Sequence, residues 1–259
     1  MELSEDQFRR YARHLILDEV GEEGQERLLR SRVLVVGAGG LGSPLLLYLA
    51  AAGVGTIGVA DDDRVDITNL QRQIVHATRN VGAPKVESAR ETLAAINPDV
   101  RVEIHPFRLD AENAEAVIAG YDLVADGSDN FVTRYLLTDL CCRLEKPLVA
   151  AALSPFEGQL STFRPYRGAG HPCYRCLFRD PPPPDLVPRC EEAGILGAVA
   201  GVLGTLQAVE VLKELLGLGD SLDGTLLLYD ALRARFHSIR IAKDPECPTC
   251  SEHTVASLP

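Results

Sequence analysis

The sequence has 259 residues, a length that suits one large α/β domain. Apolar residues make up 46% of it, enough to bury a core, and the net charge is −11. Because the charge is acidic and no basic run interrupts it, we expect no nucleic-acid partner. The start of the chain has no signal-peptide pattern, and the composition is typical of a cytoplasmic globular enzyme.

The first 30 residues are expected to form a helical segment ahead of the sheet. Ser4 is a suitable N-cap for a helix over residues 5–17, which is rich in arginine and includes Arg13. A second short helical pattern covers residues 22–29. The first strand–helix unit that follows does not need this segment to be complete.

Residues 32–152 alternate between strand and helix patterns. The run at 32–37 is continuously apolar, as expected for a strand of a parallel sheet that is covered on both faces. Further strands are expected at 56–60, 100–105, 121–125 and 148–152, and helices at 41–52, 84–96, 111–119 and 131–144. This alternation predicts an α/β fold with a Rossmann-like, doubly wound parallel sheet.

The pattern changes after Pro155, where the sheet is expected to continue in mixed or antiparallel form. Strands are expected at 158–163, 225–229 and 235–241, around a long helix that ends near Leu216. The uncharged stretch at 194–209 is too short to span a bilayer. We interpret it as a buried core helix in which small residues such as Gly197 and Gly201 allow close packing, and we expect no membrane partner.

Two Cys-x-x-Cys pairs, Cys173 with Cys176 and Cys247 with Cys250, lie in this second half. Each pair places two thiolates on one turn, and two such pairs complete a closed Cys₄ zinc site of the structural type. Redox pairs and disulfides are the alternatives, and the odd cysteine count of seven disfavours disulfides. The cysteines at 141–142 are expected to be small apolar side chains in a buried helix.

A glycine-rich turn joins the first strand of the sheet to the helix that follows. Its glycines, Gly37, Gly39, Gly40 and Gly42, match G-x-G-x-x-G, which lets amides at a helix start approach phosphate. Asp61 ends the next strand, where a carboxylate commonly hydrogen-bonds a ribose hydroxyl. The motif predicts an adenine nucleotide but does not separate NAD from ATP.

Polar residues follow two strands of the predicted sheet. Asn69 and Arg72 lie in the irregular stretch after the second strand, and Lys85 opens the next helix. Two cations at the carboxyl edge suit a triphosphate better than a dinucleotide. Asp129 and Asn130 follow a later strand at the same edge, where the Asp129 carboxylate is placed to hold Mg²⁺. The alternatives are a surface cation at Arg72, a solvated helix lysine at Lys85 and a helix N-cap at Asp129.

Six motifs follow one another along the chain: GAGGLGS, D-x-D-x-V-x-x-x-N-L-Q-R-Q, V-G-x-P-K-V-E-S-A, D-x-x-D-N, P-C-Y-R-C-L and C-P-T-C. Over residues 4 to about 250 they resemble the MoeB/ThiF family, bacterial relatives of ubiquitin-activating enzymes, and the MoeB type most of all. The resemblance implies an enzyme that uses Mg-ATP to adenylate the Gly-Gly carboxyl terminus of a small ubiquitin-fold sulfur-carrier protein, with release of pyrophosphate. A sulfur donor, such as a cysteine desulfurase or a rhodanese, then gives the thiocarboxylate.

The resemblance also implies roles for individual residues. Asp61 would bind ribose, Asn69, Arg72 and Lys85 would contact the triphosphate, and Asp129 would hold Mg²⁺.

Two more implied roles lie outside the nucleotide-binding half. Arg13 matches an arginine that reaches across a homodimer into the partner's ATP site, although sequence alone favours a solvated helix cation. Cys190 matches the position of the family's thiol nucleophile. The implied organisation is one domain over residues 1–259, with a helical segment (1–30), a nucleotide-binding half (31–153) and a zinc-bearing, carrier-binding half (154–259).

Two other functions stay open at this point. The glycine motif alone fits an NAD-dependent oxidoreductase, but no hydride-transfer constellation is evident, and the paired cations and cysteine pairs would be unexplained. A non-catalytic scaffold that binds a ubiquitin-like protein is the other alternative. Candidate residues at every nucleotide position speak against it.

Overall fold

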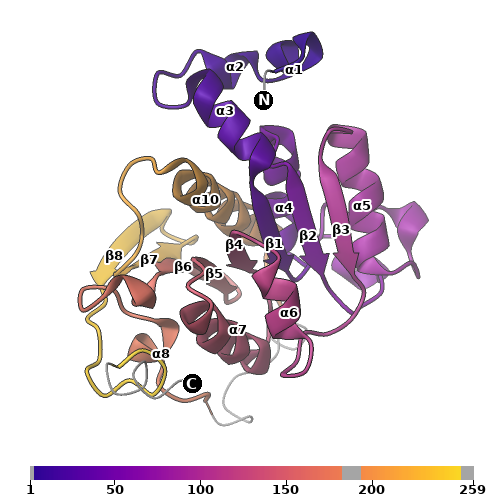
Figure 1. Ribbon diagram of the computed structural model, residues 1–259. Coiled ribbons are helices and arrows are strands. Elements are labelled where there is room, and N and C mark those ends of the chain that lie inside the picture. Colours follow the sequence, from indigo (N-terminus) through magenta and orange to yellow (C-terminus); the bar gives the residue numbers. More distant parts are fainter. Residues whose placement is uncertain (1–2, 183–193, 252–259) are drawn as a thin grey trace.

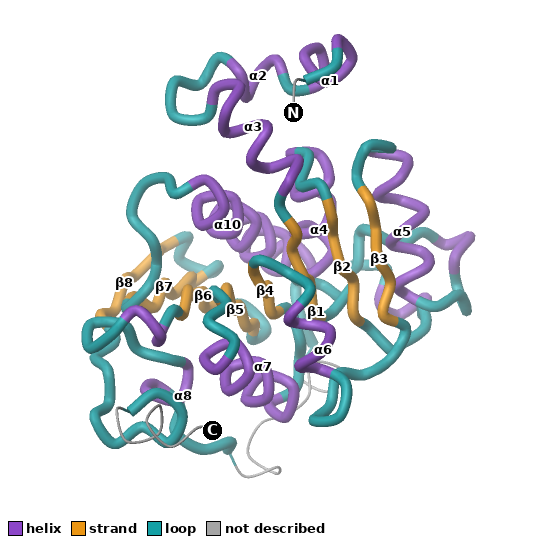
Figure 2. The backbone as a smooth tube through the Cα atoms, viewed as in Figure 1, coloured by secondary structure: helices purple, strands orange, loops and turns teal. Residues whose placement is uncertain are grey.

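The computed structural model describes residues 3–182 and 194–251, and Figures 1 and 2 show their arrangement. The helices are α1 (Glu5–Arg10), α2 (Ala12–Leu15), α3 (Gly21–Arg30), α4 (Gly42–Ala52), α5 (Lys85–Ile96), α6 (Ala114–Ala119), α7 (Phe131–Arg143), α8 (Tyr174–Leu177) and α10 (Gly197–Leu216). The strands are β1 (Arg32–Val36), β2 (Thr56–Ala60), β3 (Arg101–His105), β4 (Leu123–Asp126), β5 (Leu148–Leu153), β6 (Glu157–Phe163), β7 (Thr225–Asp230) and β8 (Arg235–Arg240). Short 3-10 helices are η1 (Ile67–Asn69), η2 (Thr78–Asn80) and η3 (Pro165–Arg167).

These strands form one 8-stranded sheet in the order β3-β2-β1-β4-β5-β6-β7-β8. Neighbours from β3 to β5 are parallel, and neighbours from β5 to β8 are antiparallel, which confirms the predicted parallel half and its antiparallel continuation. The chain runs outward from β1 to β3 and then returns to β4 on the other side of β1. In open α/β sheets, ligands bind outside the carboxyl ends of the strands at such a reversal, which here lies between β1 and β4.

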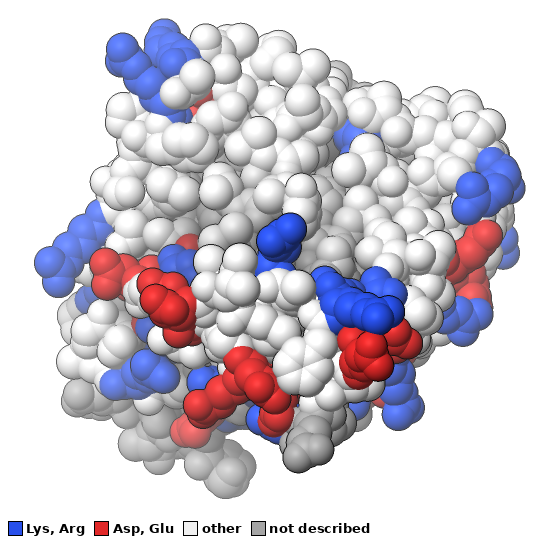
Figure 3. Space-filling view, turned by 90° about the horizontal axis from the view of Figure 1, so that it is seen from above, with Lys and Arg blue, Asp and Glu red and all other residues white. Residues whose placement is uncertain are grey.

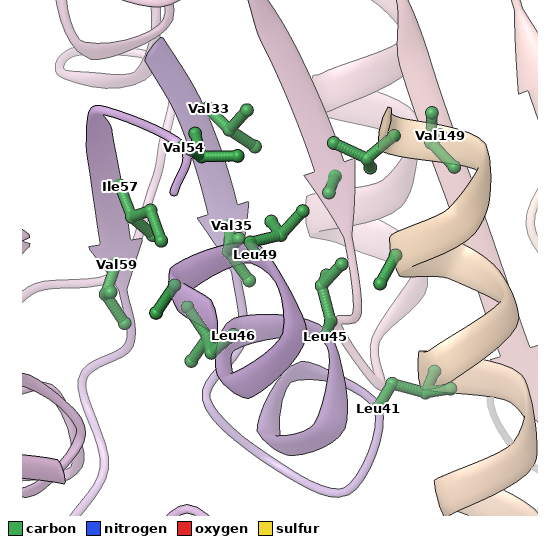
Figure 4. Packing of buried hydrophobic residues seen from close by; sticks show 14 of the residues in the cluster. Val33, Val35, Leu41, Leu45, Leu46, Leu49, Val54, Ile57, Val59 and Val149 are labelled. Carbon is green, nitrogen blue, oxygen red and sulfur yellow. The ribbon is translucent and has the colours of Figure 1, made fainter. Parts of the chain in front are cut away.

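Helices cover both faces of the parallel part (Figure 1). One core holds α4, α5 and α10, and the other holds α6 and α7. Val33 and Val35 of β1 belong to the first core, whereas Leu34 and Val36 belong to the second. Figure 4 shows Val35 beside the leucines of α4. Because both faces of β1 are buried, its sequence is apolar throughout rather than alternating.

The long helix α10 is confirmed, and Gly197 of the predicted pair does allow a close approach, because a Cβ there would lie 2.2 Å from the carbonyl oxygen of Gln71. Its close contact with the start of α4 is made by a third glycine. A Cβ on Gly204 would lie 2.3 Å from the carbonyl oxygen of Leu41, whereas a Cβ on Gly201 would meet nothing within 4 Å. The helix is also not buried all round, because Val202 and Val209 are exposed on its outer side. No helix among the described residues is long and apolar enough to cross a membrane.

The N-terminal segment starts as predicted but consists of two short helices rather than one. The Ser4 hydroxyl accepts the Gln7 N–H at 3.2 Å, and the Gln7 side chain accepts the Ser4 N–H at 3.0 Å, which forms a capping box. The helix is interrupted at Tyr11, whose ring is buried over Gly53. The Tyr11 hydroxyl accepts a 2.9 Å bond from Asn97, so the segment is fixed against the ends of α4 and α5.

The surface seen from above in Figure 3 mixes charges of both signs. Lys and Arg side chains lie in separate groups, several of them beside Asp and Glu, around a broad uncharged area. Arg9 pairs with Glu5, and Arg30 pairs with Glu26. The described part of this face therefore has no continuous basic surface of the kind that nucleic-acid binding requires.

Candidate functional site

The turn after β1 contains glycines for two different reasons. Gly37 has φ of +93°, and a Cβ on Gly42 would lie 1.8 Å from the Gly37 carbonyl oxygen, so the chain itself requires both glycines. Gly39 instead faces open space, where the nearest atom to a Cβ would be Gln73 Nε2 at 3.7 Å. The turn is therefore open at the position where a phosphate would approach.

One backbone amide of this turn donates to a carboxylate, and two others have no acceptor in the described part of the chain. The Ala38 N–H donates to Asp61 Oδ2 at 2.8 Å, and the Asp63 N–H donates to Asp61 Oδ1 at 2.9 Å. Within residues 3–182 and 194–251, the N–H groups of Gly39 and Gly40 have no hydrogen-bond acceptor. Two free amides beside a fixed carboxylate suit a phosphate and a ribose, because each Asp61 oxygen can still accept a further hydroxyl.

Arg72 and Asn69 lie against the glycine turn. A Cβ on Gly40 would be 3.6 Å from Arg72 Cγ, so the aliphatic part of the arginine passes over that glycine. Arg72 Nη2 donates to Asn69 Oδ1 at 2.7 Å, and Gln73 Nε2 donates to the same oxygen at 3.3 Å. These two bonds fix the amide so that its Nδ2 group, which has no acceptor among the described residues, is available to a ligand.

Lys85 is buried, so the alternative of a solvated helix lysine is wrong. Its side chain is 7% exposed, and Nζ donates to Asp63 Oδ2 at 2.6 Å. Burial raises the pKa of the Asp61 carboxyl, and the nearby Lys85 charge, followed by the N–H bonds from Ala38 and Asp63, counteracts that shift. The arrangement places a cation beside the Asp61 carboxylate, paired with an Asp63 side chain that is 66% exposed.

The turn after β4 lies beside the glycine turn, because Asp126 pairs with Val36 of β1. Asp126 is fully buried, and its Oδ1 accepts the Ser128 N–H at 2.9 Å. Arg134 of α7 donates to the Ser128 carbonyl at 2.7 Å and lies 3.8 Å from Asp126 Oδ2. Gln207 of α10 donates to the Asp126 carbonyl at 2.9 Å. Arg134 and Gln207 thus fix this turn, and no sequence motif pointed to either of them.

The cap of α7 is Asn130, so the alternative of Asp129 as the N-cap is wrong. Asn130 Oδ1 accepts the Thr133 N–H at 2.9 Å and a bond from Arg108 Nη2 at 3.1 Å. Asp129 is exposed, and within the described ranges its carboxylate has no hydrogen-bond or ion-pair partner. An oxygen ligand that no neighbour uses fits a hard cation such as Mg²⁺.

His76 is a further residue at the glycine turn that sequence reasoning missed. Its Nε2 lies 2.9 Å from the Ala38 carbonyl oxygen, and its Nδ1 lies 2.9 Å from Ser88 Oγ. Burial lowers the pKa of His76. The bond to the Ala38 carbonyl opposes this shift, and the nearby Lys85 charge adds to it. The one sequence signal that could have pointed to His76 is its place in the irregular stretch that also holds Asn69 and Arg72. A histidine between apolar residues is otherwise no specific signal of a site.

Acid pH is expected to destabilise the protein through His76. Because the folded state disfavours its protonation, the unfolded chain binds more protons below the ordinary pKa of about 6.5. The free energy of unfolding should therefore fall as the pH drops below that value, by at most about 1.4 kcal/mol per pH unit for this group. Urea denaturation at several pH values should give a shallower dependence for His76→Gln than for wild type. His237→Gln, on the exposed strand β8, is the control, and equal slopes for all three proteins would contradict the expectation.

The four predicted zinc ligands lie together. Cys173 Sγ is 3.9 Å from Cys176 Sγ and 3.5 Å from Cys247 Sγ, and Cys176 Sγ is 3.4 Å from Cys250 Sγ. Tetrahedral zinc with Zn–S bonds of about 2.3 Å separates sulfurs by about 3.8 Å, so the cluster is compatible with zinc. Cys142 packs against the cluster rather than filling a core, and its Sγ lies 3.7 Å from the Thr249 carbonyl.

Arg13 lies at the end of the sheet opposite the glycine turn, where the parallel strands begin. Its neighbour His14 contacts Gln25 at 2.9 Å, and Gln25 donates to the carbonyl of Ala52, the last residue of α4. The glycine turn leads into the first residue of this 11-residue helix, which is about 16 Å long. Arg13 is exposed and has no partner among the described residues. Within its own subunit it therefore lies far from the nucleotide turn.

Cys190 lies outside the described residues.

The fold and the site define a Rossmann-like nucleotide-binding protein with a phosphate-binding turn at the strand reversal. The sequence pattern of the ThiF family matches residues 11–249, so the chain belongs to the ThiF family, and the predicted resemblance is confirmed.

Curated relatives cover nearly the whole chain. It is 52% identical to the sulfur carrier protein adenylyltransferase of Thermus thermophilus over 97% of this chain and 94% of that protein. It is 51% identical to the SAMP-activating enzyme E1 of Haloferax volcanii over 100% of this chain and 94% of that protein. The crystal structure of E. coli MccB with ATP is similar with a TM-score of 0.77 and 18% identity, over 96% of this chain and 82% of that one, which shows the fold alone.

Proposed function

We propose that the protein is an ATP-dependent adenylyltransferase that activates the Gly-Gly carboxyl terminus of a small ubiquitin-fold sulfur-carrier protein. The observation that carries the proposal is the convergence at one sheet edge of free turn amides, the cations Arg72 and Lys85, and the unpaired Asp129 carboxylate. A triphosphate needs these parts, and a nicotinamide dinucleotide does not. Relatives named as a sulfur carrier protein adenylyltransferase and an E1 enzyme, each about half identical, support it.

Each part of the site has a defined task in binding ATP. The amides of Gly39 and Gly40 donate to phosphate oxygens, and Asp61 accepts a ribose hydroxyl. The Arg72 guanidinium, beside Gly40, and the Lys85 ammonium, beside the Asp61–Asp63 stretch, would neutralise the phosphates. Lys85 must then exchange the exposed Asp63 carboxylate for phosphate, a favourable exchange because the side chain is already buried and oriented.

The reaction is a displacement at the α-phosphorus. A carboxylate oxygen of the carrier terminus forms a bond to that phosphorus, the bond to the oxygen bridging the α- and β-phosphates breaks, and pyrophosphate leaves. Negative charge accumulates on the phosphoryl oxygens, and fixed cations such as Arg72 and Lys85 stabilise it without reorganisation. Asp129 would hold Mg²⁺, which supplies further charge neutralisation at the phosphates when it is bound.

The carrier protein is the proposed partner of the second half of the chain. We assign nucleotide binding to residues 31–153 and carrier binding to residues 154–259, with the short N-terminal helices as a separate segment. The outer sulfur of a donor persulfide would attack the acyl-adenylate after pyrophosphate has left, which displaces AMP and gives an acyl disulfide. A thiol would then reduce that S–S bond and leave a thiocarboxylate on the carrier.

ATP–pyrophosphate exchange tests the proposal. Labelled pyrophosphate should enter ATP only when the protein, Mg²⁺ and a carrier ending in Gly-Gly are all present. The matched control is the same carrier without its terminal glycine. Exchange that ignores this deletion, or reduction of NAD in place of exchange, would contradict the proposal. Carrier binding without any exchange would point to the scaffold alternative.

We propose that zinc in the Cys₄ cluster is structural. Four thiolates leave no open coordination position, so the ion cannot bind water or polarise a substrate. The cluster joins the turn at α8 to the chain after β8, two segments whose contacting cysteines, Cys173 and Cys247, are 74 residues apart in the sequence. Metal binding there would therefore stabilise the end of the fold rather than take part in the reaction.

Cys176→Ser is expected to lower zinc content and stability, with activity falling only as folded protein is lost. Loss of a metal ligand should reduce the free energy of unfolding by about 3 kcal/mol, or roughly 10 °C in Tm at this chain length. Zinc content and Tm are the measurements. Cys142→Ser is the control, because Cys142 lies beside the cluster without completing it, and its Tm should stay within about 2 °C of wild type. A Cys176 variant with full zinc and normal Tm would remove it from the ligand set.

We also propose that the active enzyme is a homodimer in which Arg13 completes the partner's site. Two observations motivate this. Arg13 is exposed and unpaired in the described residues, and its own nucleotide turn lies at the opposite end of α4. A guanidinium delivered to the phosphates of the partner subunit would add charge stabilisation of the arginine-finger kind.

A further inference from the structure

We propose that His76 is a positioning residue that locks one peptide group of the glycine turn in its phosphate-binding orientation. The inference deepens the proposed function, on which it rests, and concerns a residue that lies beneath the turn rather than against a ligand. His76 is 7% exposed, and Ser88, its partner on α5, is 1% exposed. It is therefore a buried polar connection between the turn and the helix that carries Lys85.

The peptide group in question joins Ala38 to Gly39. Its carbonyl oxygen lies 2.9 Å from His76 Nε2. A trans peptide group is planar, with its C=O and N–H bonds pointing in opposite directions. Holding the Ala38 carbonyl toward the interior therefore directs the Gly39 N–H away from His76, and that N–H has no acceptor among the described residues.

A lock is needed because this peptide borders a glycine. Glycine has no Cβ, so it adopts backbone conformations on both sides of φ = 0 at little steric cost, and a peptide flip beside it is cheap. The Ala38 N–H is held from the other side by Asp61 Oδ2 at 2.8 Å. Asp61 and His76 thus fix both polar groups of Ala38, and only the amides beyond it stay available for phosphate.

The protonation state of His76 follows from its two partners. The Ala38 carbonyl can only accept, so Nε2 has to carry the hydrogen. The Ser88 hydroxyl can then donate to Nδ1, which selects the neutral Nε2–H tautomer. Lys85 is the charged group that faces the ring from α5, and it disfavours a second proton.

Three substitutions separate positioning from a merely structural role. His76→Gln keeps a donor long enough to reach the Ala38 carbonyl, whereas His76→Asn is too short to do so. Ser88→Ala keeps the ring and the Ala38 carbonyl but removes one of the two groups that favour the Nε2–H tautomer. All three are measured as full-length protein with wild-type carrier, by the Michaelis constant for ATP in pyrophosphate exchange and by calorimetric titration with ATP.

His76→Asn should raise the Michaelis constant for ATP about tenfold, the effect of losing one oriented hydrogen bond. Its rate at saturating ATP and its Michaelis constant for the carrier should stay within about threefold of wild type. His76→Gln should keep most of the wild-type affinity for ATP, and Ser88→Ala should bind ATP a few-fold more weakly than wild type. Imidazole ¹H–¹⁵N NMR spectra should show the Nε2–H tautomer in wild type and a mixture in Ser88→Ala.

Several results would overturn the inference. These are unchanged ATP affinity in a folded His76→Asn variant, or equal losses in His76→Gln and His76→Asn. If His76→Asn does not fold, unchanged ATP affinity in a Ser88→Ala variant whose ring has become a mixture of tautomers decides against the lock. Absence of exchange in wild type would instead count against the proposed function, and ATP titration of the same proteins would still test the lock.

Discussion

Asp129→Ala is expected to reduce carrier-dependent pyrophosphate exchange by three or more decades, about 4 kcal/mol of lost transition-state stabilisation. The Asp129 carboxylate is exposed at the sheet edge and has no partner among the described residues, so nothing in the fold depends on it. Its loss should remove an Mg²⁺ ligand and leave Tm unchanged. Carrier binding, which uses surface outside the nucleotide turn, should be largely retained.

The matched control for this loss is Asp220→Ala. Asp220 is also an exposed carboxylate without a partner in the described residues, but it lies in the loop between α10 and β7. Exchange should be normal in that variant. Asp129→Asn keeps one ligand oxygen and loses the charge, so its exchange rate should lie between those of Asp129→Ala and Asp220→Ala. Near-normal exchange in Asp129→Ala would defeat the Mg²⁺ assignment.

Arg13→Ala is expected to be nearly inactive alone and to recover activity when mixed with Asp129→Ala. A mixed dimer has one site with both defects and one site with neither, if Arg13 acts in the partner's site. Random exchange of equal amounts makes half of the dimers mixed, so activity should return to about a quarter of wild type. Pyrophosphate exchange after proven subunit exchange is the measurement.

Arg9→Ala is the control for the complementation experiment, because Arg9 lies on the same segment but pairs with Glu5 on the surface. It should be active without mixing. Full activity of Arg13→Ala alone would remove Arg13 from the site. Proven subunit exchange without recovery, or an active monomer, would show that it does not act across subunits.

Much of the fold could be predicted because its signals are local. The apolar run of β1 and the alternation that follows specify a covered parallel sheet, and that sheet is present. The break at Tyr11 could not be predicted, because it depends on a slot over Gly53, 42 residues away in the sequence. Gly197 was predicted correctly as a close-packing glycine of α10, whereas Gly204 was missed, since the choice between Gly201 and Gly204 depends on which face of the helix meets α4.

The candidate site shows the same division between local and distant signals. Residues that we propose to contact the nucleotide lie in motifs with a chemical reason for their spacing, so Asp61 and Arg72 could be named from the sequence. Residues that hold those groups in place lie elsewhere: Gln207 reaches the turn after β4 from α10, and His76 reaches the glycine turn from the stretch before α5. A buried glutamine or histidine has no sequence pattern that reveals which carbonyl it binds.

The proposed reaction is attack of the carrier carboxylate on the α-phosphorus of ATP. The most direct test follows the label from ATP carrying ³²P at either the α- or the γ-position, with the protein, Mg²⁺, carrier and pyrophosphatase. We expect acid-stable label on the carrier from α-labelled ATP and none from γ-labelled ATP, with the terminal glycine of the carrier required. Label on the carrier from γ-labelled ATP would show phosphoryl transfer, and no label from either would show that no adenylate forms. Either result would rule out carrier adenylation by this protein.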